Sequence, residues 1–334
     1  MPGKIKQIKK AIKILEIANA VYKLLGANGH IKDIREGPKV YSCDYSLDNP
    51  GAVDLGKLIK NLGGNLSKIG DKELTIDLAK AEQDIVQLAS LLSSPEFKKT
   101  KNALPVIFGV DTVGKPMILD LFKMPHLLVG GQAGSGKSTL LKSVYESLTR
   151  KLKSSALKFL IIDSKNTDFA KYKNSQYLLK PIVNKPEKGL VALEQVVDIM
   201  NERYAQLRAA KVKNIQEYQK KHKDMPYIIV MVDELSDLMA QNRREVESCI
   251  QQIAQKARAT GIHLIVATRD LSRGNISDMI RANLPTVVAF KTRDKSGSVR
   301  ILGESGAENL LNYGDILLSN AGRMPVRMHP AYTR

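Results

Sequence analysis

The sequence predicts an α/β protein in which helices cover a mostly parallel sheet, and two observations support this fold class. Short apolar runs recur through the second two thirds of the chain, separated by segments long enough to form helices. Most of these runs are continuous rather than alternating, which is typical of strands buried on both faces of a parallel sheet. The predicted strands are 126–129, 159–162, 228–232, 263–267, 287–290 and 316–318, and the longest predicted helix is 190–221.

Composition excludes several classes of protein. An apolar fraction of 43% over 334 residues is enough to fill real hydrophobic cores, so a disordered chain is excluded. The two cysteines, Cys43 and Cys249, provide neither a disulfide scaffold nor a zinc site, and they suit a cytoplasmic protein. No apolar run approaches the roughly 20 residues that cross a bilayer, so no transmembrane segment is expected.

The formal net charge of +18 favours a polyanionic partner, which could be nucleic acid or an acidic membrane surface. A lysine-rich surface that only promotes solubility is the alternative. Aromatic residues make up 5% of the chain and Trp is absent. This scarcity argues against a platform on which the bases of single strands stack.

Residues 1–30 are predicted to form a basic amphipathic helix, with its helical part at 4–25. One apolar stripe runs from Ile5 to Leu15 and a second from Ile14 to Leu24, with lysines interleaved. Such a helix can pack on its own domain, form a coiled coil or lie on a membrane surface. The sequence leaves these three roles open.

Residues 31–100 are predicted to form a small α/β domain, and residues 101–334 a large one. The elements expected in the small domain are a strand at 40–45, a helix at 53–62, a strand at 74–78 and a helix at 81–92. The polar stretch 93–102 follows and is rich in serine and lysine with one proline. This stretch marks the predicted boundary between the two domains.

The segment 131–138 matches the P-loop pattern G-x-x-x-x-G-K-[ST], and it lies between a predicted strand and a predicted helix. Glycines allow the backbone to wrap around phosphate groups, the lysine adds positive charge and the serine hydroxyl binds Mg²⁺. The sequence therefore predicts ATP and Mg²⁺ as cofactors. The residues expected to contact the nucleotide are Gly131, Gln132, Ala133, Gly134, Ser135, Gly136, Lys137, Ser138 and Thr139.

Two carboxylates follow the predicted strand 228–232. Asp233 is expected to hold the Mg²⁺ ion together with Ser138, and Glu234 is expected to polarise the attacking water. This pair indicates a hydrolysing ATPase rather than a nucleotide-binding switch. The strand 263–267 ends at Thr268, which could sense the γ-phosphate or could be an ordinary solvated strand end.

Several longer segments resemble the FtsK/SpoIIIE family of DNA translocases. They read MPHLLVGG (124–131), PYIIVMVDELSDLM (226–239), AQKARATGIHL (254–264), IRANLPT (280–286), GAENLL (306–311), GDILL (314–318) and PVRMH (325–329). The matches cover residues 104–332 almost continuously. Residues 38–95 resemble the family's smaller ring-forming domain only in the order of their elements, strand–helix–strand.

The resemblance implies a RecA-like P-loop motor that assembles into a homo-oligomeric, hexameric ring with double-stranded DNA in its channel. It also implies that ATP binds between subunits and that Arg258 reaches the γ-phosphate of the neighbouring subunit. The segments 270–278 and 292–303 fall where the family places its channel loops. Within them, Arg273, Lys295 and Arg300 are candidates for contacts with DNA phosphates.

Three departures from the family pattern stand out. Arg269 occupies the position where the family usually has glutamine, so either Arg269 substitutes for that residue or Thr268 acts alone. The other two are the winged-helix domain of cellular members and the membrane anchor, neither of which is expected from this sequence, which ends at Arg334. These features are compatible with a cellular, plasmid or viral protein.

The hypothesis favoured by the sequence is an ATP-driven translocase that pumps double-stranded DNA without base-specific contacts. One alternative is a related ring ATPase for conjugative transfer or viral genome packaging. The other is a DNA-binding or replication initiator protein that uses ATP as an assembly switch.

Overall fold

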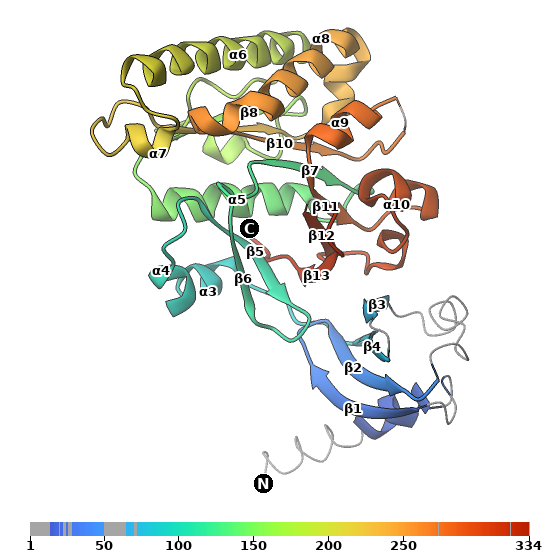
Figure 1. Cartoon of the computed structure of the whole chain (residues 1–334). Helices are drawn as coiled ribbons and strands as arrows, with labels where there is room; N and C mark the ends of the chain where they lie inside the picture. The colour runs from blue at the N-terminus through green and yellow to red at the C-terminus, as the bar shows by residue number, and fades with distance from the viewer. Residues whose placement is uncertain are drawn as a thin grey trace. The chain divides into compact units, whose positions relative to one another are not determined.

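A computed structural model describes residues 14–19, 21–22, 25, 29–49, 65–69, 72–272, 274–320 and 322–333 (Figure 1). The chain forms two compact units, Met1–Ile85 with Val110–Lys115, and Val86–Gly109 with Pro116–Arg334. The expected boundary at residue 100 therefore falls inside the second unit. The reason is a small apolar cluster within that unit, in which Leu88 and Phe97 are buried with Ile107 and Ala331.

The first unit contains a four-stranded antiparallel sheet with the order β1-β2-β4-β3. Its strands are β1 (Gly29–Glu36), β2 (Val40–Leu47), β3 (Asn65–Ile69) and β4 (Glu73–Ala79). The predicted strands at 40–45 and 74–78 correspond to β2 and β4. The other two strands were not predicted, and the helix expected at 53–62 lies outside the described residues.

One face of this sheet is covered by the N-terminal segment. The described residues 14–19, 21–22 and 25 are helical. Ile17, Val21 and Leu25 are buried and pack with residues of β2 and β4, whereas Leu15 is 62% exposed. The second apolar stripe of the predicted helix is thus the one that packs against its own unit.

The helix predicted at 81–92 is wrong over most of its length. Only Leu88–Leu92 is helical (α3), and it is followed by α4 (Pro95–Lys99). The backbone before α3 is hydrogen-bonded to the turn between β1 and β2 instead of forming a helix. The N–H groups of Lys80 and Asp84 donate to the carbonyls of Lys39 and Pro38 at 2.9 Å each. Ile85, inside the predicted helix, is 67% exposed.

The second described sheet has nine strands in the order β6-β5-β13-β12-β11-β7-β10-β9-β8. The five strands from β11 to β8 are parallel, and β12 and β13 extend them in antiparallel fashion. The predicted α/β fold with a mostly parallel sheet is confirmed. The strands are β5 (Pro105–Asp111), β6 (Pro116–Asp120), β7 (His126–Gly130), β8 (Leu157–Ile162), β9 (Tyr227–Val232), β10 (Ile262–Thr268), β11 (Thr286–Phe290), β12 (Ile316–Asn320) and β13 (Val326–His329).

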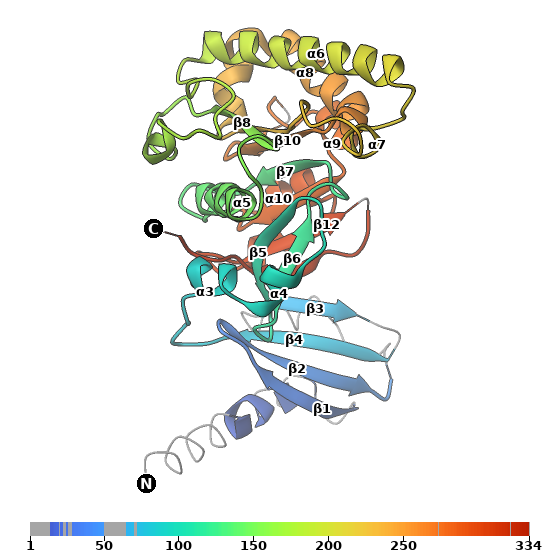
Figure 2. The ribbon, with the colours of Figure 1, turned by 90° about the vertical axis from the view of Figure 1, so that its left-hand side faces the viewer.

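Helices cover both faces of the parallel strands. Figures 1 and 2 show α6 (Pro186–Ala209) and α8 (Leu235–Lys256) on one face and α5 (Lys137–Lys151) on the other. Alternate residues of β7 enter two separate cores, since Leu128 packs with α6 and α8 while Leu127 and Val129 pack with α5. Burial on both faces explains why the strands were visible as unbroken apolar runs.

The long helix predicted at 190–221 is divided in two. The first part, α6, ends at Ala209, and the short α7 (Ile215–Tyr218) begins after a break. Asn214 accepts a hydrogen bond from the Glu217 N–H, and the Glu217 side chain accepts one from the Lys213 N–H. This reciprocal capping starts a new helix. Two further α-helices of the described part of the chain are α9 (Asp278–Asn283) and α10 (Lys295–Leu302).

Candidate active site

The segment 131–136 connects β7 to α5, as the P-loop pattern requires. Gly131 has a φ of +153°, and a Cβ added to it would lie 2.6 Å from the Cβ of Phe290. The loop is tied to its neighbours, because the Gln132 N–H donates to the Lys291 carbonyl at 2.9 Å and the Gly314 N–H donates to the Ser135 carbonyl at 3.2 Å. The loop therefore packs against the carboxyl end of β11 and against the segment before β12.

The polar groups of the loop match a phosphate ligand. Lys137 Nζ donates to the carbonyls of Gly131 and Gln132 at 2.8 and 2.9 Å. Burial lowers the pKa of Lys137 to about 8, against the opposing effect of Glu234 and Asp233. The Ser135 hydroxyl is buried and makes no hydrogen bond within the described residues. At neutral pH a cation and an unused donor thus lie in a glycine-rich loop, and this arrangement fits ATP.

Ser138 connects the loop to two acidic residues. Its hydroxyl donates to Asp168 Oδ2 at 2.8 Å and lies 3.4 Å from Asp233 Oδ1. Burial raises the pKa of Asp233 to about 6, and the nearby carboxylates of Asp168 and Asp163 add to the rise. A divalent cation would relieve this repulsion, so the hydroxyl and carboxylate pair predicted for Mg²⁺ is chemically suited to it.

Asp168 was not identified from the sequence. It lies in the loop after β8 and also approaches Lys142 Nζ, at 3.4 Å. The loop is shaped by Asp163, which accepts hydrogen bonds from the backbone N–H groups of Asn166, Asp168 and Phe169 at 3.0 to 3.2 Å. The sequence carries a signal for Asp163, which follows an apolar strand in the same way as Asp233 follows β9, but no comparable signal for Asp168.

Glu234 is brought together with Thr268 at the ends of β9 and β10. The Thr268 and Ser236 hydroxyls both donate to Glu234 Oε1 at 2.8 Å, and the Arg269 N–H donates to the same oxygen at 3.3 Å. Arg269 Nε lies 3.3 Å from Oε2. Thr268 is fully buried. Its hydroxyl is therefore a support for the Glu234 carboxylate rather than a solvated strand end.

Arg258 does not lie with these residues. It belongs to the 3₁₀ turn Ala257–Thr260 that precedes β10, and its guanidinium carbon lies 5.9 Å from the ring centre of Phe122. Phe122 precedes β7, so Arg258 is at the amino-terminal edge of the parallel strands. The P-loop and Glu234 are at the carboxyl edge, roughly 20 Å away for strands of this length. The side chain of Arg258 is exposed.

Two of the three candidate DNA contacts share one depression. Lys295, Arg300 and Arg281 line a hollow of about 550 Å³ between α9 and α10, together with Asp278. Arg300 Nη1 donates to the Leu271 carbonyl at 2.6 Å, so its side chain is held in place. Arg273 lies outside the described residues. The hollow follows the carboxyl ends of β10 and β11, the same edge of the sheet as the P-loop.

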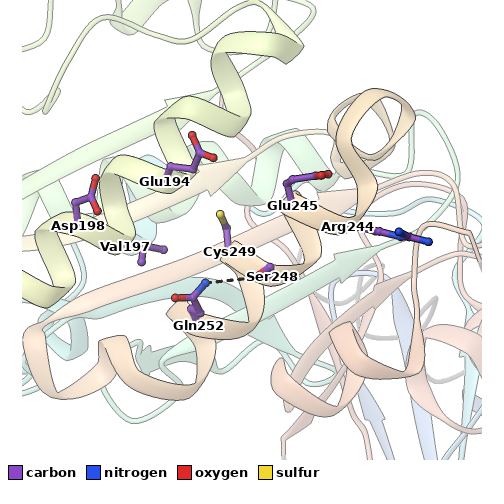
Figure 3. A pocket seen from close by; sticks show the side chains of 8 residues that line it. All are labelled: Glu194, Val197, Asp198, Arg244, Glu245, Ser248, Cys249 and Gln252. Carbon is purple, nitrogen blue, oxygen red and sulfur yellow. Dashed lines mark hydrogen bonds between the residues drawn. The ribbon is translucent and has the colours of Figure 1, made fainter.

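A second depression, of about 610 Å³, lies between α6 and α8 and contains none of the predicted site residues (Figure 3). Its lining includes Glu194 and Asp198 from α6 and Cys249 from α8. Burial raises the pKa of the Cys249 thiol to about 11, so it is not a thiolate at neutral pH. This depression shows no chemistry related to the nucleotide.

The described residues contain no group of three or more His, Cys, Asp or Glu side chains placed to bind a metal. A Mg²⁺ site of the predicted kind needs no such group, since Mg²⁺ usually binds one or two carboxylates and completes its shell with water and phosphate oxygens. Within the described segments, no helix combines the length and apolar character needed to span a bilayer.

A parallel sheet with a P-loop after one strand and an acidic pair after a nearby strand defines a P-loop ATPase. Residues 87–273 match the model of the FtsK/SpoIIIE family, and the chain belongs to this family. It is 35% identical over 342 residues to the DNA translocase FtsK of Haemophilus influenzae, covering 90% of this chain and 64% of that protein. It is 32% identical over 367 residues to the FtsK of Rickettsia typhi, covering 96% and 49%. The chain thus spans about half to two thirds of the length of these relatives.

Solved structures support the same fold. The conjugation coupling protein TcpA of pCW3, determined with ATPγS, superposes with a TM-score of 0.66 at 21% identity and covers 95% of this chain and 93% of its own. The cytoplasmic domain of the type VII secretion ATPase EccC from Thermomonospora curvata gives a TM-score of 0.65 at 25% identity, covering 75% and 32%. The predicted family and the P-loop fold are therefore confirmed.

Proposed function

We propose that the chain is the motor of an ATP-driven translocase that pumps double-stranded DNA through a hexameric ring of identical subunits. The observation that carries the proposal is the separation of Arg258 from its own P-loop. Lys137, Ser138, Asp233 and Glu234 gather at the carboxyl edge of the sheet, whereas the exposed Arg258 lies at the opposite edge. An arginine placed in this way does not reach its own nucleotide, so a catalytic role for it requires the site of a neighbouring subunit.

Each residue of the site has a specific part in hydrolysis. The P-loop N–H groups and Lys137 bind the phosphates, while Ser138 and Asp233 hold Mg²⁺, which supplies positive charge to the phosphate oxygens when bound. Glu234 accepts a proton from the attacking water, and Thr268 fixes one oxygen of Glu234. The neighbour's Arg258 offsets the charge that develops on the transferred phosphoryl group.

DNA is expected to be held by its phosphates. The hollow lined by Arg281, Lys295 and Arg300 presents three cations at the P-loop edge of the sheet, and Arg273 belongs to the same region of the sequence. Contacts of this kind give affinity without base recognition. The two free, buried cysteines, Cys43 and Cys249, support a reducing, cytoplasmic location.

The test is the ATPase rate of the chain with no nucleic acid, with single strands and with duplex DNA. Strong stimulation by duplex supports the translocase. Stimulation by single strands alone would favour a conjugative or packaging ATPase, and negligible turnover would favour an ATP switch. Lys137→Ala and Glu234→Gln are the controls, because the first should lose nucleotide binding while the second should bind ATP without hydrolysing it.

A further inference from the structure

The carboxylate of Glu234 is enclosed by donors on both oxygens. Its side chain is 2% exposed. Oε1 accepts three hydrogen bonds, from the Thr268 and Ser236 hydroxyls at 2.8 Å and from the Arg269 N–H at 3.3 Å. Oε2 faces two cations, Arg269 Nε at 3.3 Å and Lys165 Nζ at 4.0 Å. Among the described residues, Arg269 is the one donor that contacts both oxygens.

This arrangement does not suit proton abstraction from water. A general base needs an oxygen within hydrogen-bond reach of the water that it deprotonates. Three donors already occupy Oε1, so Oε2 is the oxygen that remains for the water. The guanidinium of Arg269 lies against Oε2 and therefore competes with a water molecule for this oxygen.

The ion pair between Arg269 and Glu234 can separate with little loss of packing. Thr268 is fully buried and Glu234 is nearly so, whereas the Arg269 side chain is 49% exposed. A half-exposed arginine can leave one anion for another at little packing cost, and a triphosphate carries more negative charge than a single carboxylate. Thr268 and Ser236 would keep Glu234 oriented after Arg269 has moved.

We propose that Arg269 is a positioning residue that restrains Glu234 in a non-hydrolysing arrangement until the guanidinium transfers to the bound nucleotide. The inference rests on the proposed role of Glu234 as the group that activates water. Substituting Arg269 with a neutral residue of similar length should remove this restraint on Glu234. The ATPase rate in the absence of DNA should then increase.

The test compares Arg269→Gln with Arg269→Lys in the full chain. Glutamine keeps a polar side chain without charge, and lysine keeps the charge. We expect Arg269→Gln to raise the DNA-free kcat about three- to tenfold, the order of one charge-assisted hydrogen bond, and to raise the KM for ATP, because the guanidinium that would move to the nucleotide is also lost. Arg269→Lys keeps a cation near Oε2 and should raise the DNA-free kcat less than Arg269→Gln does. A DNA-free kcat of Arg269→Gln that is unchanged or lower would overturn the restraint.

Two further variants make the result specific. Lys165→Gln removes the more distant cation from the same oxygen and should change kcat less than Arg269→Gln; an equal rise would show a general charge effect and contradict the proposal. The double variant Arg269→Gln/Glu234→Gln should be as inactive as Glu234→Gln alone. If Glu234→Gln alone turns over normally, the proposed role of Glu234 fails. If Glu234→Gln is inactive while Arg269→Gln shows no gain, only the restraint fails.

Discussion

Ser138 donates its hydroxyl hydrogen bond to Asp168, at 2.8 Å, while Asp233 lies farther from the same hydroxyl, at 3.4 Å. Two carboxylates thus adjoin the serine that is proposed to bind Mg²⁺. They differ in their surroundings. Asp233 is 6% exposed at the tip of β9, whereas the Asp168 side chain is 30% exposed in a loop and faces Lys142. A rigid, buried strand end is the better support for a metal ligand.

We expect Asp233→Asn to lower kcat/KM on the order of 100-fold and to raise the Mg²⁺ concentration needed for activity, because a direct ligand is lost. Asp168→Asn should cost less, about tenfold, since Asp168 then acts only through Ser138. The measurement is ATPase rate against Mg²⁺ concentration for both variants. A larger loss in Asp168→Asn would transfer the role of metal ligand to Asp168.

The P-loop glycines should differ in their tolerance of a side chain. An added Cβ at Gly131 meets the Cβ of Phe290 at 2.6 Å and the Lys291 carbonyl oxygen at 3.2 Å, whereas at Gly134 it meets nothing within 4 Å. Gly131→Ala should lower the free energy of unfolding by about 1–3 kcal/mol from overpacking, in addition to backbone strain. Gly134→Ala, with a φ of +73°, should cost only the strain of about 1–2 kcal/mol. Urea unfolding compares them, and equal losses would refute the contact with Phe290.

Two buried histidines predict acid sensitivity of the fold. Burial lowers the pKa of His126 to about 3 and that of His263 to about 4, from ordinary values near 6.5. Below pH 6.5 these histidines bind protons in the unfolded chain but stay neutral in the folded chain. Each histidine therefore lowers the free energy of unfolding by about 1.4 kcal/mol per pH unit, down to its folded pKa. Asp233, with its pKa raised to about 6, acts in the opposite direction below pH 6.

The net expectation between pH 7.5 and 5 is a loss of about 3 kcal/mol in the free energy of unfolding. Denaturant titrations without Mg²⁺ or nucleotide measure it. His263→Gln is the matched control and should remove about half of the histidine contribution. Stability that stays constant or rises on acidification over this range would contradict the assignment of neutral, buried imidazoles.

The sequence predicted the parts of the fold that carry a local signal. Six strands of the large sheet were recognisable because burial on both faces makes each an unbroken apolar run, and the P-loop was recognisable because phosphate binding demands glycines at fixed positions. Strands β1 and β3 were missed, since pairing with β2 and β4 rather than an apolar run defines them. In the large sheet, β5, β6 and β13 were not predicted either. The break before α7 was in fact encoded by the capping residues Asn214 and Glu217.

The site was predictable only where a residue follows a recognisable strand. Asp233, Glu234 and Thr268 were named for that reason, and the structure places Glu234 and Thr268 in contact. The position of Asp168 depends on how Asp163 folds the loop after β8, and this cannot be read from spacing alone. The sequence left the role of Arg269 open. Its ion pair with Glu234 depends on two strand ends that are adjacent only in the folded sheet.

Arg258 provides the test of a site shared between subunits. Because it lies at the opposite edge of the sheet from its own P-loop, Arg258→Ala should leave ATP binding intact and lower the ATPase rate of a uniform assembly by about 10³-fold or more, the effect typical of an arginine finger. Lys137→Ala should be inactive for a different reason, since its own phosphates are not held. Each variant is therefore deficient in one half of the same composite site.

Mixing the two inactive proteins should restore activity. Where a Lys137→Ala subunit donates its intact Arg258 to the intact P-loop of an Arg258→Ala subunit, one complete site is rebuilt. ATPase rate is measured against mixing ratio, with light scattering to confirm that mixed assemblies form, and a maximum at an intermediate ratio is expected. A mixture that stays inactive would indicate that turnover requires every site in the ring. Full activity of Arg258→Ala alone, or a strictly monomeric chain with ATP and duplex DNA present, would rule out the shared site and the ring translocase with it.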